Sequence, residues 1–241
     1  MIILEILINS MYKQITTSAD SDIIGVNNGL YQLEFKEKEL KKSLNYEVIK
    51  DVLLNFDVNN FLKNQDSIQK TETSILTAHL LKKAKLTDIM TFAPYFFGYK
   101  YVVSEKFVNC LSNVANTREE YHLREINIKG IDEKYYLLFI QMIPSSEINF
   151  SKSLFYSENI GGIDNKNYLQ ISDYGEYSKQ IKETPFIKWE RIVLNKEYED
   201  RKIISLQAST ELFFSNILIY VLKKNDVSNF IVREGCELVF Y

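Results

Sequence analysis

The chain has few of the residues that would give it flexible linkers or covalent cross-links. Its 241 residues include 8 glycines, 3 prolines and 2 cysteines. Glycine and proline dominate flexible and semi-rigid spacers, so their scarcity argues against long linkers. Cys110 and Cys236 stand alone in the sequence, which is typical of reduced, buried thiols in a cytoplasmic protein. A single disulfide between them stays open, but nothing in the sequence favours it.

The sequence also lacks an excess of charge of one sign. It contains 29 Lys and Arg against 32 Asp and Glu, a net charge of −3. A nucleic-acid binder normally carries a basic face or tract, so we expect no nucleic-acid partner. With 46% hydrophobic and 25% charged residues, the composition is typical of a globular protein with a sizeable core.

No stretch of the chain has the length of a membrane-spanning helix, which needs about 20 consecutive apolar residues. The first eight residues are apolar apart from Glu5, but they lack the basic region and the cleavage site of a signal peptide. We predict a buried strand at 2–8, while an alternative start at Met11 would make residues 1–10 a dispensable extension. We therefore expect a cytoplasmic protein with no membrane partner.

Sequence patterns for catalysis or metal binding are missing as well. The glycines at 25 and 29 are not followed by the Lys-Ser/Thr pair of a phosphate-binding loop. The two histidines, His79 and His122, are 43 positions apart and neither lies near a cysteine, so no metal-ligand spacing is present. We expect no cofactor, no metal and no enzymatic activity.

Acidic residues provide the main alternative to this interpretation. Glu119 and Glu120 precede a predicted strand, and Glu197 and Asp200 lie between two others. Glycosidases need two carboxylates that converge across a cleft, which clusters on turns do not by themselves provide. A hydrolytic enzyme that gathers these carboxylates in one pocket stays open, as does a structural module whose aromatic edge strands pair with another chain.

The strongest fold signal lies between residues 87 and 143. Ser104 is placed to cap a helix, and the apolar residues after it recur at helical spacing. Two β-rich runs follow at 121–128 and 135–143, and the segment between them contains Gly130 and suits a hairpin turn.

The rest of the chain alternates short β-rich runs with polar turns. We predict a helix at 46–54, a loop at 59–74 and a second amphipathic helix that begins at Ser215 and has Lys223 and Lys224 in its last turn. The remaining predicted strands are 12–17, 31–35, 75–84, 148–156, 168–172, 186–194, 203–208, 230–232 and 238–241.

The order of these elements predicts the fold class. Strands cluster rather than alternate regularly with helices, which indicates an α+β fold with a mostly antiparallel sheet and a few helices packed on one face. We place a β-rich region at residues 1–74 and an α+β domain at 75–241; whether residues 1–74 belong to the same domain stays open.

One segment has the composition of a protein interface. Residues 173–177 read Asp-Tyr-Gly-Glu-Tyr and are predicted to form an exposed loop. Tyrosine provides rigid contact area, and acidic side chains complement a basic partner. We therefore predict that Asp173, Tyr174, Glu176 and Tyr177 bind a partner; an ordinary exposed loop is the alternative.

The central signature resembles a family of bacterial immunity proteins of polymorphic toxin systems, first catalogued as a domain of unknown function. The matching residues are Asp88-Ile89-Met90, then Val103-Ser104-Glu105-Lys106-Phe107, followed by paired strands that contain Tyr135-Tyr136-Leu137-Leu138. Members of that family also end with a second helix and strand, and the resemblance covers roughly residues 75–241.

This resemblance implies a non-enzymatic inhibitor. Such a protein binds a cognate toxin domain in the cytoplasm and blocks its active site or its access to substrate. The family has no defined toxin-contacting motif, so the resemblance assigns no contact residue, no particular toxin and no oligomeric state.

Overall fold

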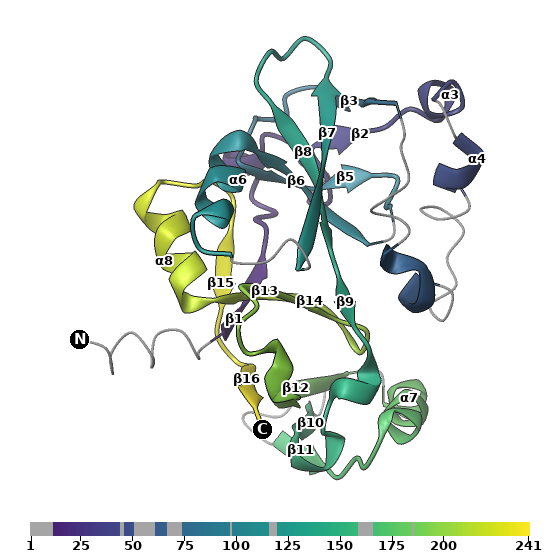
Figure 1. Cartoon of the computed structure of the whole chain (residues 1–241), viewed down its shortest axis with the longest axis vertical. Helices are drawn as coiled ribbons and strands as arrows, with labels where there is room; N and C mark the ends of the chain where they lie inside the picture. The colour runs from purple at the N-terminus through teal and green to yellow at the C-terminus, as the bar shows by residue number, and fades with distance from the viewer. Residues whose placement is uncertain are drawn as a thin grey trace. The chain divides into compact units, whose positions relative to one another are not determined.

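The computed structural model describes residues 12–43, 46–50, 61–66, 74–96, 98–115, 120–158, 166–184 and 186–241. The chain folds into two compact units. Among the described residues, unit 1 comprises those at 12–15, 143–217 and 232–241, and unit 2 comprises those at 16–142 and 218–231. Both units combine helices with strands, so the α+β prediction is confirmed (Figure 1).

Unit 2 is built on a seven-stranded sheet that closes on itself. The strand order is β4 (Ile89–Met90), β6 (Tyr99–Ser104), β8 (Tyr135–Ile140), β7 (Tyr121–Ile128), β3 (Leu76–Leu80), β2 (Leu33–Glu34) and β5 (Phe92–Ala93). The two outer strands, β4 and β5, are separated in the chain only by Thr91, so the sheet must curl until its edges meet. The carbonyl O of Thr91 accepts a hydrogen bond from Gln32 N at 3.0 Å.

Most neighbouring strands of this sheet are antiparallel, as the sequence predicts. The pairs β3–β7 and β2–β5 are parallel, so the sheet is mixed. The hairpin of β7 and β8 lies at the predicted place, with Tyr121 opposite Ile140 and Ile126 opposite Tyr135. Gly130 in its connection has φ +79°, a left-handed conformation that glycine adopts without strain.

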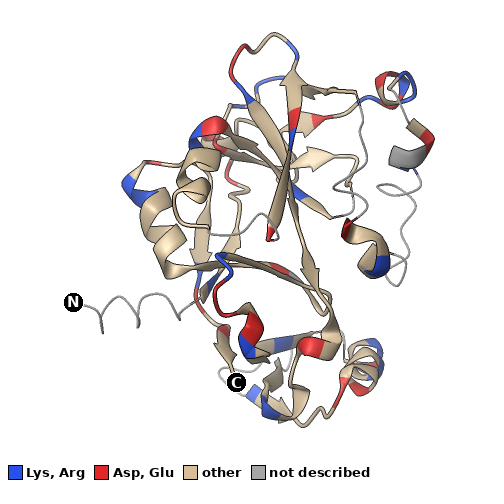
Figure 2. Ribbon diagram, viewed as in Figure 1, with Lys and Arg blue, Asp and Glu red and all other residues tan. Residues whose placement is uncertain are grey.

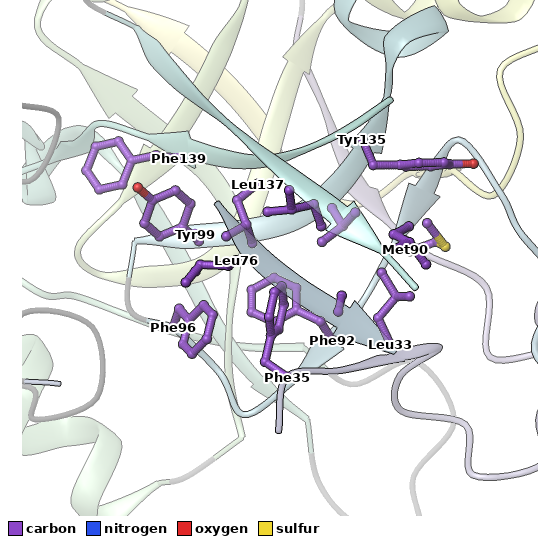
Figure 3. Packing of buried hydrophobic residues seen from close by; sticks show 14 of the residues in the cluster. Leu33, Phe35, Leu76, Met90, Phe92, Phe96, Tyr99, Tyr135, Leu137 and Phe139 are labelled. Carbon is purple, nitrogen blue, oxygen red and sulfur yellow. The ribbon is translucent and has the colours of Figure 1, made fainter. Parts of the chain in front are cut away.

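Large apolar side chains on one face of this sheet form the core of unit 2 (Figure 3). Alternate residues of β8 enter it, because successive side chains of a strand point to opposite faces. Figure 3 shows Tyr135, Leu137 and Phe139 from β8 together with Tyr99 from β6. The ring of Phe96 lies in the same cluster, completely buried.

Two helices of this unit begin where the sequence predicts. Helix α6 (Glu105–Ser112) follows directly on β6, and the hydroxyl of Ser104 accepts a hydrogen bond from Phe107 N at 3.2 Å. Helix α8 (Asn216–Lys224) starts after Ser215 and ends with Lys223 and Lys224. Each helix buries an apolar stripe, made of Phe107, Cys110 and Leu111 in α6 and of Leu218, Ile219 and Leu222 in α8.

The region before residue 80 differs from the prediction in two ways. The predicted loop at 59–74 contains a helix at 61–66, because Phe61 is buried in the core and Gln65 exchanges two hydrogen bonds with the backbone of Met142. The predicted division at residue 74 does not coincide with a unit boundary, since β2 pairs with β3 across it.

The N-terminal region also contains short helices: α2 (Ser21–Ile24), α3 (Glu37–Leu40) and α4 (Tyr46–Ile49). Helix α4 starts where the helix at 46–54 is predicted, and the later part of that prediction lies outside the described residues. The strand predicted at 2–8 also lies outside them.

Unit 1 contains two sheets. One has the order β15 (Ile231–Arg233), β1 (Tyr12–Thr16), β14 (Ser209–Ser215), β13 (Ile203–Leu206) and β9 (Met142–Ile143). The other has the order β11 (Lys166–Leu169), β10 (Leu154–Glu158), β12 (Ile187–Leu194) and β16 (Glu237–Phe240). The chain passes from β15 in the first sheet to β16 in the second at Gly235, where φ is +126°.

A single apolar cluster joins the two sheets of unit 1 with the helix α7 (Tyr174–Glu183). Phe213 and Ile204 come from the first sheet, Phe155 and Ile192 from the second, and Tyr177 from α7. The strand predicted at 148–156 is correct only from residue 154, because a 3-10 turn at Phe150–Lys152 precedes it. None of the described helices has the length and the apolar character needed to cross a membrane.

Candidate protein-binding groove

The segment predicted to be an exposed loop is the start of helix α7. Asp173 Oδ1 accepts a hydrogen bond from Glu176 N at 2.8 Å, and Glu176 Oε2 accepts from Ser172 N and Ser172 Oγ, both at 2.8 Å. Asp173 thus satisfies one of the N–H groups that a helix leaves free at its first turn, and Glu176 reaches back to Ser172, just before the capping residue. The loop prediction is wrong, and the Asp-x-x-Glu spacing was the sequence signal for this helix start.

The two tyrosines of this segment lie in different environments. Tyr177 is 4% exposed and packs against the rings of Phe155 and Trp189, with centroids 5.6 and 5.0 Å away. Tyr174 is 37% exposed and lies beside Phe150. Of the four predicted contact residues, Tyr174 therefore offers the exposed aromatic surface, whereas Tyr177 is part of the core.

A groove of about 630 Å³ runs beside α7 within unit 1. Ile181 and Tyr177 from the helix, Ile187 and Trp189 from β12, and residues of β14 and β15 line it. Strand β16 pairs with residues 191–194 of β12, whereas the groove lies along residues 187–189 of β12, before this pairing begins. Both sheets and the helix therefore contribute to one open surface.

Trp189, the single tryptophan of the chain, is fixed in the floor of this groove. Its ring contacts Phe155 with a centroid distance of 4.4 Å, and its Nε1 donates a hydrogen bond to Tyr177 Oη at 2.9 Å. The hydroxyl of Tyr177 donates in turn to the carbonyl O of Ala208 at 3.2 Å. The polar atoms of the floor are satisfied internally, so the half-buried indole presents a rigid apolar surface.

Charged residues of both signs lie at the rim of the groove. Arg233 Nη1 is 3.9 Å from Glu211 Oε1, and Lys188 is exposed on β12. Glu234 is paired with Lys13. Acidic and basic residues are also interspersed along α7, as Figure 2 shows.

Two further hollows of unit 1 are less suited to a partner. A cleft of about 360 Å³ lies on the other side of Gly235, and its charges are engaged with one another in pairs such as Arg191 with Glu237 at 2.8 Å. A second hollow of about 630 Å³ near the start of α7 is lined by apolar residues such as Phe150 and Ile171, by serines and by the capping residue Glu176. Neither contains the tryptophan or an arginine with a weak partner.

Three of the residues that carry the family resemblance, Asp88, Ser104 and Lys106, meet in a polar cluster of unit 2. Asp88 Oδ1 accepts a hydrogen bond from Ser104 Oγ at 2.6 Å, and Asp88 Oδ2 accepts from Ser228 N at 2.7 Å and Ser228 Oγ at 2.8 Å. Lys106 Nζ lies 2.8 Å from the same carboxylate and also donates to the carbonyl O of Asp226. The cluster ties the segment after α8 to β4 and to the start of α6.

This cluster is a structural connection rather than a nucleophilic site. Burial alone would raise the pKa of Asp88, but hydrogen bonds from Lys106, Ser104 and Ser228 outweigh it and hold the pKa below its ordinary value. A carboxylate with a lowered pKa is a weak base, and the hydroxyl of Ser104 also caps α6. We therefore assign Ser104 a structural role.

A second set of buried polar side chains extends this connection. Asn229 Nδ2 donates to the carbonyl O of Ile89 at 2.7 Å and to Gln32 Oε1 at 3.2 Å, while its Oδ1 accepts from Ser18 N at 2.9 Å. Asn229 has φ +62°, a conformation that asparagine adopts more readily than most residues. The segment after α8 is thus held to three separate parts of unit 2.

The carboxylates proposed for a hydrolytic enzyme do not form a described site. Glu120 is buried in unit 2, whereas Glu197 and Asp200 are exposed in unit 1, on and after the 3-10 turn Lys196–Tyr198. Glu119 lies outside the described residues.

Local contacts and burial account for the positions of the histidines and cysteines. His79 Nε2 lies 2.8 Å from Glu39 Oε2, and burial together with Arg124 lowers the pKa of His122. Cys110 and Cys236 are both buried and free, as predicted. No group of three or more His, Cys, Asp or Glu that could hold a metal occurs among the described residues.

Comparison with known proteins adds no relative. No protein-family model, curated protein or solved structure matches this chain.

Proposed function

We propose that this chain is an immunity protein that binds a cognate bacterial toxin domain in the cytoplasm and neutralises it by blocking its active site or its access to substrate. The observation that carries the proposal is the groove of unit 1, where Trp189, Ile181 and Arg233 line one open surface. Tryptophan, tyrosine and arginine dominate the energetic centres of protein interfaces. The resemblance of residues 88–107 and the strands after them supports a toxin as the class of partner.

Rigidity of the groove floor supports tight binding. Binding costs free energy when side chains must be ordered, and a side chain that is already held avoids that cost. Trp189 is held by the rings of Phe155 and Tyr177 and by the hydrogen bond from its Nε1. A stable complex buries about 1,600 Å² in total, so the groove would be the centre of a larger contact that includes the exposed Tyr174 on α7.

Co-expression with the toxin tests the proposal. A candidate toxin domain from the gene beside the one for this chain is expressed in bacteria alone, with the chain, and with an unrelated immunity protein as control. The proposal predicts that the chain alone restores growth and co-purifies with the toxin domain. Equal growth arrest with and without the chain, together with no co-purification, would rule the proposal out.

A further inference from the structure

The chemistry of the groove indicates which kind of segment it binds. We propose that it takes a peptide segment of its partner in which a large apolar side chain lies next to an Asp or Glu. The apolar side chain would lie on Trp189, and the carboxylate would bind Arg233. This inference rests on the proposed function, since the segment would belong to the toxin domain.

The floor and one wall of the groove suit an apolar side chain. The indole of Trp189 is half-buried, Ile187 is half-buried beside it on β12, and Ile181 of α7 is exposed. The indole N–H and the hydroxyl of Tyr177 already have acceptors. An apolar group can therefore cover this floor without leaving a buried polar atom unsatisfied, which would otherwise cost free energy.

The rim of the groove favours a carboxylate over a cation. Among the described residues, Arg233 has one ion-pair contact, to Glu211 at 3.9 Å, which is longer than a hydrogen bond. Glu234, which also lines the groove, is paired with Lys13. A guanidinium presents donors in a fork that matches a carboxylate, so an acidic side chain can form two parallel hydrogen bonds with it.

Selection from a displayed library of random peptides tests this inference. The library is panned against the immobilised full chain and, in parallel, against the variants Arg233→Glu and Trp189→Ala. We expect the unaltered chain to enrich peptides in which an aromatic or large aliphatic residue neighbours Asp or Glu. Arg233→Glu should exchange the acidic preference for Lys or Arg, and Trp189→Ala should lose the enrichment.

Three results would overturn the inference. They are enrichment of basic peptides on the unaltered chain, the same enriched peptides on Arg233→Glu, and no enrichment at all. If Trp189→Ala does not fold, as judged by circular dichroism, Ile181→Asp replaces it, because Ile181 is exposed on α7 and its substitution leaves the core intact. Ile181→Asp should also lose the enrichment.

A titration then measures the contribution of Arg233. Trp189 is the single tryptophan of the chain, so its fluorescence reports the binding of an enriched peptide that contains no tryptophan. We expect Arg233→Glu to weaken binding at least about tenfold, because it replaces an attraction with a repulsion. The matched control is Lys179→Glu, the same charge reversal on an exposed residue of α7 that does not line the groove, and it should change the affinity less than about twofold.

The toxin co-expression assay separates this inference from the proposed function. Growth rescue and co-purification that persist unchanged in Arg233→Glu and Ile181→Asp would overturn the inference and leave the proposed function intact. Absence of rescue by the unaltered chain, with selective peptide binding retained, would count against the proposed function alone.

Discussion

Removal of the Asp88 side chain should strongly destabilise the protein, because this carboxylate holds the segment after α8 in place. It is 11% exposed and accepts hydrogen bonds from Ser104 Oγ, Ser228 N and Ser228 Oγ. Hydrogen bonds to a charged group contribute about 1.5–3 kcal/mol each. In Asp88→Ala the two hydroxyls can rotate, and Lys106, whose side chain is 46% exposed, can return to water, but Ser228 N–H loses its acceptor.

We therefore expect Asp88→Ala to lower the free energy of unfolding by about 3 kcal/mol. For a chain of this length, that corresponds to a decrease in Tm of about 10 °C. Chemical unfolding followed by far-UV circular dichroism measures the change. The matched control is Asp132→Ala, which removes an exposed aspartate from the hairpin turn of unit 2 and should cost less than about 0.5 kcal/mol.

The pH dependence gives a second, independent readout of the same cluster. The pKa of Asp88 is lowered in the folded state, so its contribution is fully present above the ordinary pKa of aspartate, about 4, and is lost as the pH falls through the folded value. Asp88→Asn keeps the shape of the side chain without its charge. The stability difference between the unaltered chain and Asp88→Asn should therefore be larger at pH 7 than at pH 3. A difference that stays constant or grows toward low pH would refute this account.

Two further predictions use matched pairs. Gly25 and Gly130 both have φ +79°, but a Cβ at Gly25 would overlap the backbone carbonyl of Lys83, whereas a Cβ at Gly130 meets no atom. Gly130→Ala should therefore lower the free energy of unfolding by about 1 kcal/mol and Gly25→Ala by about 3 kcal/mol or more. Chemical unfolding measures both values, and equal losses would contradict the close approach at Gly25. Tyr177→Ala should lower the free energy of unfolding by about 3–5 kcal/mol, because it empties a core position. Tyr174→Ala should lower it by less than about 1 kcal/mol, because that ring is partly exposed. Thermal unfolding compares the two variants, and the reverse order would contradict the placement of the two rings.

Elements with a local signal were predictable from the sequence. The Ser104 cap and the apolar stripe after it define α6, and the alternation of 121–128 with the turn at Gly130 defines the hairpin. Both depend on residues close together in the chain, so a short window contains the whole signal.

Elements fixed by distant contacts were not predictable in the same way. The helix at 61–66 depends on Gln65 and the backbone of Met142, which lies far along the chain. The closure of the unit 2 sheet depends on Thr91, a single residue that joins its two edge strands and has no distinguishing sequence pattern. In these regions tertiary contacts decide the local conformation.

The candidate site illustrates the same limit. Tyr177, Trp189 and Arg233 come from a helix and from strands of two different sheets, and no local spacing connects them. The composition of residues 173–177 draws attention to the start of α7, but it does not distinguish the exposed Tyr174 from the buried Tyr177. The single tryptophan was the one sequence feature that could have indicated the groove.

The most direct test is a titration of the purified toxin domain with this chain, in which calorimetric binding and residual toxin activity are measured in the same samples. Our account predicts that inhibition is complete at a fixed molar ratio of chain to toxin and that Arg233→Glu weakens binding and inhibition together. Inactivation of excess toxin by a trace of the chain would instead reveal catalytic turnover and contradict the account.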